Sequence, residues 1–193
     1  MVSDDEGCAR RKLLSGVGAA LVGFGAVGLA GCGTSGATGQ TAAKKVSPPV
    51  EHTDVEILDG LLALERRTVA AYTAGMPLLR RADAKMAKQF LYQEFQHTGE
   101  LLGLIKSAGG EDPPRPESYD LGHPRDDQEV LALLHSLERA QIAAYLHAIP
   151  RLKPGPVRAA AASILASDAQ HIAILRLTQG LTPAPSALVT AAE

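Results

Sequence analysis

Six residues of types that bind metal ions recur along this chain at a spacing that suits one shared site. They are Glu65, Glu94, His97, Glu138, Asp168 and His171. In two of the segments an acid is followed by a histidine three residues later, and on a helix residues i and i+3 share a face. Carboxylate and imidazole together are ligands that iron and manganese accept. The pattern therefore predicts a carboxylate and histidine site for metal.

A polar core that needs no metal is the alternative interpretation of the same residues. A third acid-x-x-His pattern, Asp120 with His123, lies in a Pro-rich segment, and we interpret it as coincidental. The other two patterns occupy repeat-related places, which coincidence explains poorly. An unpaired acid in an apolar stripe is costly, and four acids together repel one another. Bound cations would remove both costs, so we favour the metal site.

The segments around these residues have the pattern of helices. Aromatic residues make up only 4% of the chain and Trp is absent, so the core must be built from Leu, Ala, Ile and Val, which favours helices over sheets. Apolar residues recur at helical spacing, and Pro or Gly follows each stretch. The sequence thus predicts an all-α fold. Its expected helices span residues 53–76, 83–108, 127–149 and 156–179.

The four expected helices form two related hairpins. Leu-Glu-Arg at 64–66 with Ala-Ala-Tyr at 70–72 recurs at 137–139 and 143–145, and Pro77 recurs as Pro150 at the same offset. Residues 93–97, with the first acid-x-x-His, match residues 167–171 with the second. A repeat of this kind predicts a bundle with approximate twofold symmetry.

The spacing also predicts that the four acids meet at one depth. Each lies 11 or 12 residues from the expected end of its helix at the hairpin turn, which is about 17 Å along a helix axis. The 18-residue segment 109–126 joins the hairpins, and it could reach roughly 60 Å if extended. It can therefore run the full length of a bundle whose helices are about 36 Å long.

The first residues of the chain have the pattern of an export signal. Arg10 and Arg11 precede an uncharged stretch, residues 13–30, that contains five glycines. The order of positive, apolar and small residues is typical of a signal peptide, and the paired arginines resemble a twin-arginine signal. Leu-Ala-Gly-Cys at 29–32 resembles a bacterial lipobox, which implies cleavage before Cys32 and lipidation of its thiol. A retained membrane-spanning helix is the alternative, but five glycines make it a weak span.

Charge and cysteine content exclude several other classes of site. The net charge of −2 provides no strong field for nucleic acid or another polyanion. The two cysteines, Cys8 and Cys32, lie outside the expected helices. A disulfide framework or a thiolate metal site is therefore not expected in the helical domain.

The arrangement of one Glu on the first and third helices and acid-x-x-His on the second and fourth resembles the ferritin-like superfamily. Gly109-Gly110, the Pro/Tyr linker and the second Leu-Glu-Arg segment look like the ferritin-like group that includes desiccation- and stress-related proteins. The resemblance covers residues 53 to 183. It implies a ferritin-like four-helix bundle with two metal ions, iron favoured over manganese. The implied ligands are Glu65, Glu94, His97, Glu138, Asp168 and His171.

The resemblance also suggests finer roles. Glu94 and Asp168 would be the acids that bridge the two ions, but the family usually has Glu where Asp168 stands, and the shorter side chain reaches less far. The second ion would then be held more weakly or differently. Tyr72 and Tyr145 each follow a Glu by seven residues on the same helix face. They would hydrogen-bond near the ligands or donate electrons, or else only pack in the core.

The resemblance implies a redox metalloprotein that uses dioxygen or peroxide, such as a ferroxidase or a peroxide-consuming enzyme. The first alternative is a non-enzymatic envelope protein that protects against drying or oxidation, with a structural or degenerate metal site. A membrane-tethered interaction module is a weaker alternative. Oligomers are compatible with all three, but a lipid tether argues against a closed ferritin cage, because every chain would need its anchor at a membrane.

The expected organisation follows from these features. It is a signal peptide at 1–32, a flexible tether at 33–52, the four-helix domain at 53–182 and a C-terminal tail at 183–193. Export by the twin-arginine route would place the protein on the outer face of the cytoplasmic membrane, in the periplasm or elsewhere in the cell envelope.

Overall fold

The computed structural model describes residues 52–192, and these residues form an all-helical fold without strands. The helices are α1 (His52–Gly75), a short 3-10 helix η1 (Met76–Leu78), α2 (Arg81–Ser107), α3 (Asp127–Ala148) and α4 (Gly155–Thr178). The expected all-α fold with four long helices is confirmed. Each observed end lies within two residues of the expected one.

Local chemistry explains where the helices begin and end. Pro77 lies within η1, directly after α1, where a helix cannot continue unbroken. Gly109 and Gly180 follow the C-termini of α2 and α4 with φ of 82° and 75°, a conformation that glycine adopts without strain. At the start of α3, the Asp126 carboxylate accepts a hydrogen bond from the Glu129 backbone N–H at 2.9 Å.

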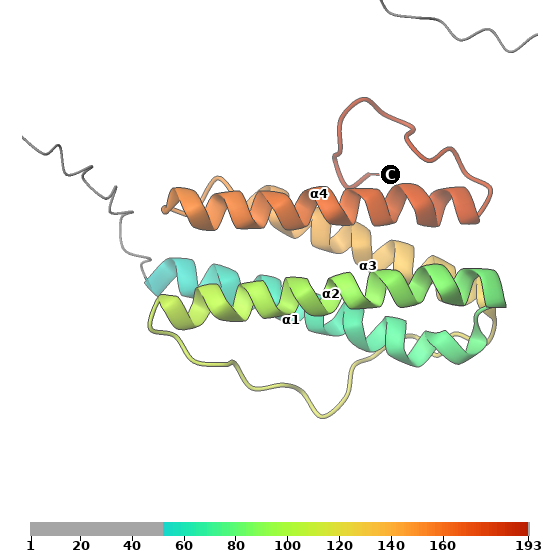
Figure 1. Cartoon of the computed structure of the whole chain (residues 1–193), viewed down its shortest axis with the longest axis horizontal. Helices are drawn as coiled ribbons and strands as arrows, with labels where there is room; N and C mark the ends of the chain where they lie inside the picture. Colours follow the sequence, from blue (N-terminus) through green and yellow to red (C-terminus); the bar gives the residue numbers. More distant parts are fainter. Residues whose placement is uncertain (1–51, 193) are drawn as a thin grey trace, which may run out of the picture. The chain divides into compact units, whose positions relative to one another are not determined.

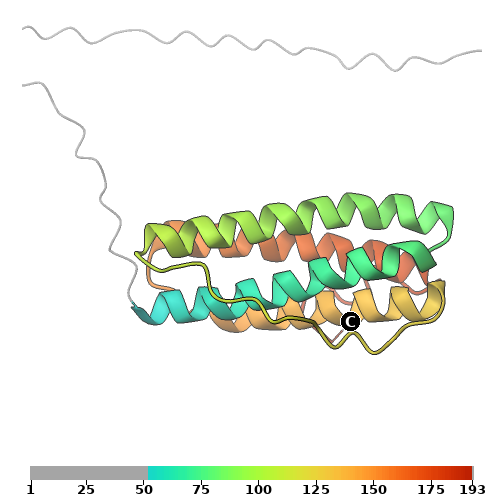
Figure 2. The same ribbon diagram turned by 90° about the horizontal axis from the view of Figure 1, so that it is seen from below.

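The two helical hairpins pack side by side, and a long crossover joins them (Figures 1 and 2). The crossover runs back along the bundle, so α3 starts at the end where α1 stops. There the Arg80 backbone N–H donates to Asp127 at 2.9 Å. At the opposite end, the Lys153 backbone N–H donates to Asp54 on the first turn of α1 at 3.2 Å. Helices α1 and α3 are therefore antiparallel neighbours.

Arginine side chains hold the crossover against α1. Arg66 is buried, donates to the Pro113 carbonyl at 2.9 Å and forms an ion pair with Asp112. Arg67 donates to the Asp120 carbonyl at 3.0 Å. The crossover thus lies along the bundle as its length predicted, fixed at both its beginning and its middle.

The apolar core consists of two separate clusters. One gathers Leu58, Leu62, Leu101 and Ile105 with Tyr145, near the start of α1. The other gathers Phe90, Val130, Leu131 and Leu134 with Tyr72, near the end of α1. The acids of interest lie between these clusters in sequence on every helix. A polar layer therefore interrupts the apolar core at mid-bundle.

The predicted export features lie outside the described residues. Arg10, Arg11 and Cys32 belong to the segment before residue 52, as do the expected signal peptide and nearly all of the tether. In the part of the chain that is described, none of the helices is sufficiently long and apolar to span a membrane.

Candidate metal centre

Four helices contribute to a buried polar layer at mid-bundle. Glu65 comes from α1, Glu94 and His97 from α2, Glu138 from α3, and Asp168 and His171 from α4. All six side chains are buried, and the four acids are fully enclosed. Because each acid lies at a similar distance from its hairpin turn, the helices bring all of them to one level.

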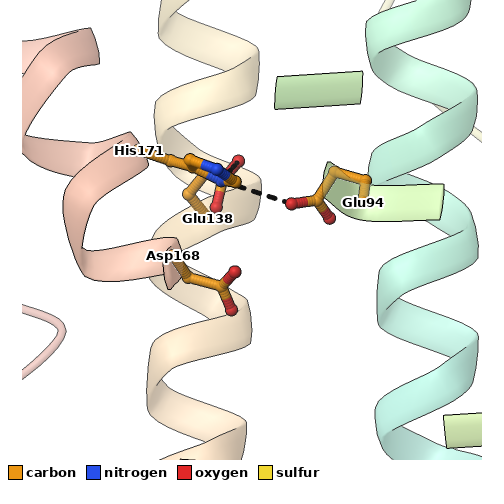
Figure 3. Close-up of side chains that lie close together, drawn as sticks. All are labelled: Glu94, Glu138, Asp168 and His171. Carbon is orange, nitrogen blue, oxygen red and sulfur yellow. Dashed lines mark hydrogen bonds and ion pairs between the residues drawn. The ribbon is translucent and has the colours of Figure 1, made fainter. Parts of the chain in front are cut away.

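The six side chains form two groups with one shared member. The first, called here the His171 group, comprises Glu94, Glu138, Asp168 and His171 (Figure 3). The second, called the His97 group, comprises Glu65, His97 and Asp168. Within each group the potential ligand atoms lie within 4.8 Å of one another. Despite its short side chain, Asp168 thus reaches both groups.

Both imidazoles present Nδ1 to the acids. His171 Nδ1 lies 3.2 Å from Glu138 Oε1 and 3.3 Å from Glu94 Oε1. His97 Nδ1 lies 3.4 Å from the same Glu94 oxygen and 3.4 Å from Asp168 Oδ1. A single oxygen of Glu94 therefore faces the histidines of both groups.

Several atoms of this layer are buried without a hydrogen-bond partner among the described residues. They are Glu65 Oε2, Glu94 Oε1, His97 Nδ1, Glu138 Oε2 and both carboxylate oxygens of Asp168. Buried polar atoms are normally paired, and an unpaired one costs about 1–3 kcal/mol. These atoms belong to the residue types that bind iron or manganese. The donor set and its unpaired atoms fit a metal-binding site.

Burial and mutual repulsion perturb the acids strongly. Burial raises the pKa of Glu65 to about 8, and it raises those of Glu138 and Asp168 as well. Glu94 is the exception: burial also opposes its ionisation, but interactions with His171 and His97 outweigh that effect and lower its pKa. Perturbed carboxylates gathered in one buried layer are typical of functional sites.

The two histidines show the complementary shift. Burial alone would lower their pKa values, but the neighbouring acids dominate. Interaction with Glu65 and Glu94 raises the pKa of His97 to about 9, and interaction with Glu138 and Glu94 does the same for His171. In the absence of metal, protonation of the histidines and of some acids therefore reduces the repulsion between the carboxylates of this layer.

Two buried tyrosines, one from each apolar cluster, contact the acids of the layer. The Tyr72 hydroxyl donates to Glu138 Oε1 at 2.7 Å, and the Tyr145 hydroxyl donates to Glu65 Oε1 at 2.6 Å. Each tyrosine thus contacts the Glu of the other hairpin, because α1 and α3 are antiparallel. Each tyrosine therefore both forms a hydrogen bond with an acid of the layer and packs in the apolar core, so the two predicted interpretations are compatible.

Comparison with known proteins agrees with this geometry. A family model described as a ferritin-like domain matches residues 53–181. The chain belongs to the ferritin-like family. No curated protein matches it.

Two solved structures share the fold of this ferritin-like chain. One is a conserved hypothetical protein of Mycobacterium tuberculosis, with a TM-score of 0.63 and 18% identity over 70% of this chain and 96% of that one. The other is described as ferritin-like, diiron-carboxylate proteins from Bacillus anthracis, with a TM-score of 0.60 and 18% identity over 65% and 94% of the two chains. At this identity, the likeness establishes the fold.

Three polar residues of the ferritin-like layer were not singled out from the sequence. The Gln141 amide donates to Glu94 Oε2 at 3.0 Å and accepts a hydrogen bond from the Thr68 hydroxyl at 2.9 Å. The Gln93 side-chain carbonyl accepts a hydrogen bond from His171 Nε2 at 2.8 Å. A signal existed for Gln141 and Thr68, because each lies one turn after a Glu of the layer. Asp120 and His123, the third acid-x-x-His pattern, remain exposed on the crossover.

Proposed function

We propose that this chain is an exported, lipid-anchored ferritin-like protein that holds a dinuclear metal centre, with iron favoured over manganese. The observation that carries the proposal is the set of buried, unpaired carboxylate and imidazole atoms that converge from all four helices. The Bacillus anthracis structural relative, described as a diiron-carboxylate protein, supports it by likeness of fold.

The proposed ligands divide between two positions. Glu138 and His171 would serve one ion, and Glu65 and His97 would serve the other. Glu94 lies near both histidines and Asp168 belongs to both groups, so these two acids would lie between the ions. Asp168 would contribute to both positions, since it belongs to both groups and its two oxygens have no hydrogen-bond partner among the described residues.

The surroundings would restrict what reaches the centre. When bound, a pair of iron ions supplies electron-transfer chemistry toward dioxygen or peroxide. Phe90 stacks on the His171 ring at a centroid distance of 4.2 Å, and apolar side chains lie on both sides of the layer. The two tyrosines keep one oxygen of Glu65 and one of Glu138 oriented. These residues would exclude water and keep the carboxylates aligned as charge changes.

Metal analysis of the intact protein tests the centre. After anaerobic loading with Fe(II) and removal of excess, we expect close to two iron ions per chain. Glu94→Ala and His97→Ala should lose most of this metal, while Glu100→Ala, at an exposed acid one turn further along α2, should retain it. A folded wild-type protein without bound metal would refute the proposal.

Aerobic addition of Fe(II), or peroxide added to the loaded protein, tests the redox role. We expect oxo-ferric absorbance to develop in the wild type and in Glu100→Ala, but not in His97→Ala. Stoichiometric metal without any reaction would favour the structural metal site of an envelope stress protein instead.

Cell fractionation tests the export proposal, whose residues precede the described part of the chain. Arg10→Lys combined with Arg11→Lys should retain the protein in the cytoplasm. Cys32→Ser should release it from the membrane fraction after export. Unchanged membrane association of both variants would contradict the proposed route and anchor.

A further inference from the structure

We infer that the two metal positions are unequal, and that the position of the His171 group binds its ion first and more tightly than the position of the His97 group. This inference rests on the proposed dinuclear centre. It concerns residues that surround the ligands rather than the ligands alone, and it assigns positioning roles to Gln93 and Gln141.

The internal repeat makes the comparison possible, because each residue on one side of the layer has a counterpart on the other. Three pairs of counterparts differ in a way that changes hydrogen bonding. They are Gln93 and Ser167, Gln141 and Thr68, and Glu94 and Asp168. In each pair the longer polar side chain either belongs to the His171 group, as Glu94 does, or forms a hydrogen bond with a member of it, as Gln93 and Gln141 do.

The first difference concerns the histidines. His171 Nε2 donates to the Gln93 carbonyl at 2.8 Å, so its Nδ1 is the nitrogen that faces the acids. The counterpart of Gln93 is Ser167, whose side chain makes no hydrogen bond to His97 in the described structure. A hydrogen bond to the distal nitrogen fixes both the tautomer and the ring orientation of a metal-binding histidine. His171 therefore has a hydrogen bond at its distal nitrogen that preorients the ring, and no counterpart of this bond is present at His97 among the described residues.

The second difference concerns the acids. Glu94 Oε2 accepts from Gln141, which is itself held by Thr68, so the other oxygen of Glu94 is directed at the ligand atoms. Thr68 occupies the place of Gln141 in the first hairpin, and it bonds Gln141 instead of an acid. Asp168 receives no such bond: both of its oxygens lack a hydrogen-bond partner among residues 52–192, and Oδ1 has only an ion-pair contact with His97 Nδ1 at 3.4 Å. One central acid is oriented in advance and the other is free to adjust.

Accessibility separates the two positions in the same direction. The His171 side chain is 2% exposed and covered by Phe90, whereas that of His97 is 10% exposed. The His171 group also has four candidate ligands within reach of one another, against three in the His97 group (Figure 3 shows the former). More ligands, held in advance and better shielded, favour earlier and tighter binding at the His171 position.

Titration of the full-length, metal-free protein with Mn²⁺ tests this order without any catalytic readout. Calorimetry should resolve two binding steps whose affinities differ at least tenfold. At one equivalent, electron paramagnetic resonance should show the six-line spectrum of isolated Mn²⁺. At two equivalents, that spectrum should give way to one of coupled ions. Two indistinguishable steps, with coupled pairs already abundant at one equivalent, would overturn the inference while leaving the dinuclear centre intact.

Variants at counterpart positions identify the cause of the difference. Loss of such a supporting hydrogen bond typically costs 10–100-fold in metal affinity, so Gln93→Leu should weaken the first step by about that factor. Ser167→Ala, the counterpart change, should leave both steps within about twofold, because Ser167 supports no ligand. An equal effect of the two variants, or an effect of Gln93→Leu on the second step alone, would refute the assignment.

Gln141→Leu provides an independent second variant, since it keeps the volume of a buried side chain and removes the bond to Glu94. It should also weaken the first step, and Thr68→Val should do so to a smaller degree. Far-ultraviolet circular dichroism of each metal-free variant confirms its fold. An unchanged first step in folded Gln93→Leu and Gln141→Leu would refute the inference. Failure of the wild type to bind any metal would refute both this inference and the proposed function.

Discussion

A single carboxylate, Glu94, connects most of the interactions in the polar layer. One of its oxygens faces the Nδ1 atoms of His97 and His171, and the other accepts from Gln141. It is also the only acid of the layer whose pKa is lowered. Its negative charge is therefore compensated by the protein itself, while its neighbours retain protons. At the scale of residues, the layer therefore combines one acid that stays ionised with three acids that favour the protonated form in the absence of metal.

The tyrosines give a prediction for stability at this scale. Tyr72→Phe and Tyr145→Phe each remove a hydrogen bond to a buried carboxylate. Each should lower the free energy of unfolding of the metal-free protein by about 1–3 kcal/mol. Urea unfolding measures the change, and Tyr92→Phe on the exposed side of α2 is the matched control. Equal stability of all three variants would show that the hydroxyl groups contribute nothing.

Residue types and spacing sufficed to find the acids and histidines, because charged groups inside apolar stripes are unusual. The same approach missed Gln93 and Gln141. Uncharged polar residues are common on helix surfaces, and only their tertiary partners show that these two form hydrogen bonds with His171 and Glu94. The hydrogen bond of each tyrosine to the Glu of the opposite hairpin likewise depends on how α1 and α3 pack. The spacing of residues within one helix carries no information on that packing.

At the scale of elements, proline and glycine made the helix boundaries predictable. Pro77 and Gly109 interrupt the helical pattern of apolar residues, and the observed helices α1 and α2 end beside them. The length of the crossover was also sufficient to predict its course. Its anchoring by Arg66 was not predictable. Arg66 and Asp112 are 46 positions apart, and nothing in the sequence indicates that these two side chains form a pair.

The close approach of α1 and α3 can be tested at Gly75, the last residue of α1. A Cβ atom added there would lie 2.6 Å from Val130 Cγ1, which belongs to a fully buried, branched side chain. Because branched side chains are stiff within helices, Gly75→Ala should destabilise the protein by about 1–3 kcal/mol. Chemical denaturation measures this loss.

Gly60 on the same helix serves as the control for Gly75. A Cβ atom at Gly60 would meet nothing within 4 Å. Gly60→Ala should therefore stabilise α1 by about 0.5–1 kcal/mol, through the higher helix propensity of alanine. If both substitutions stabilised the protein, the contact between the end of α1 and the start of α3 would be looser than the structure indicates.

At the scale of the whole domain, the polar layer makes stability depend on pH. Folding raises the pKa of Glu65 from 4.5 to about 8 and those of His97 and His171 from 6.5 to about 9. The folded, metal-free state therefore holds more protons than the unfolded state between about pH 5 and 9, and its stability must fall as the pH rises through that range. Glu94 has the opposite shift, so its contribution is lost only as the pH falls below 4.5.

Bound metal should offset the loss of stability at high pH, because its ligands bind in their deprotonated forms. We expect the melting temperature of the metal-free protein to fall by roughly 10 °C or more between pH 6 and 9. The metal-loaded protein should change much less, so the gap between the two forms should widen with pH. Thermal unfolding with and without a chelator measures both curves. Glu65→Gln, which removes one titrating acid, should make the metal-free curve shallower, and a metal-free curve that is flat or rises with pH would contradict this account of the layer.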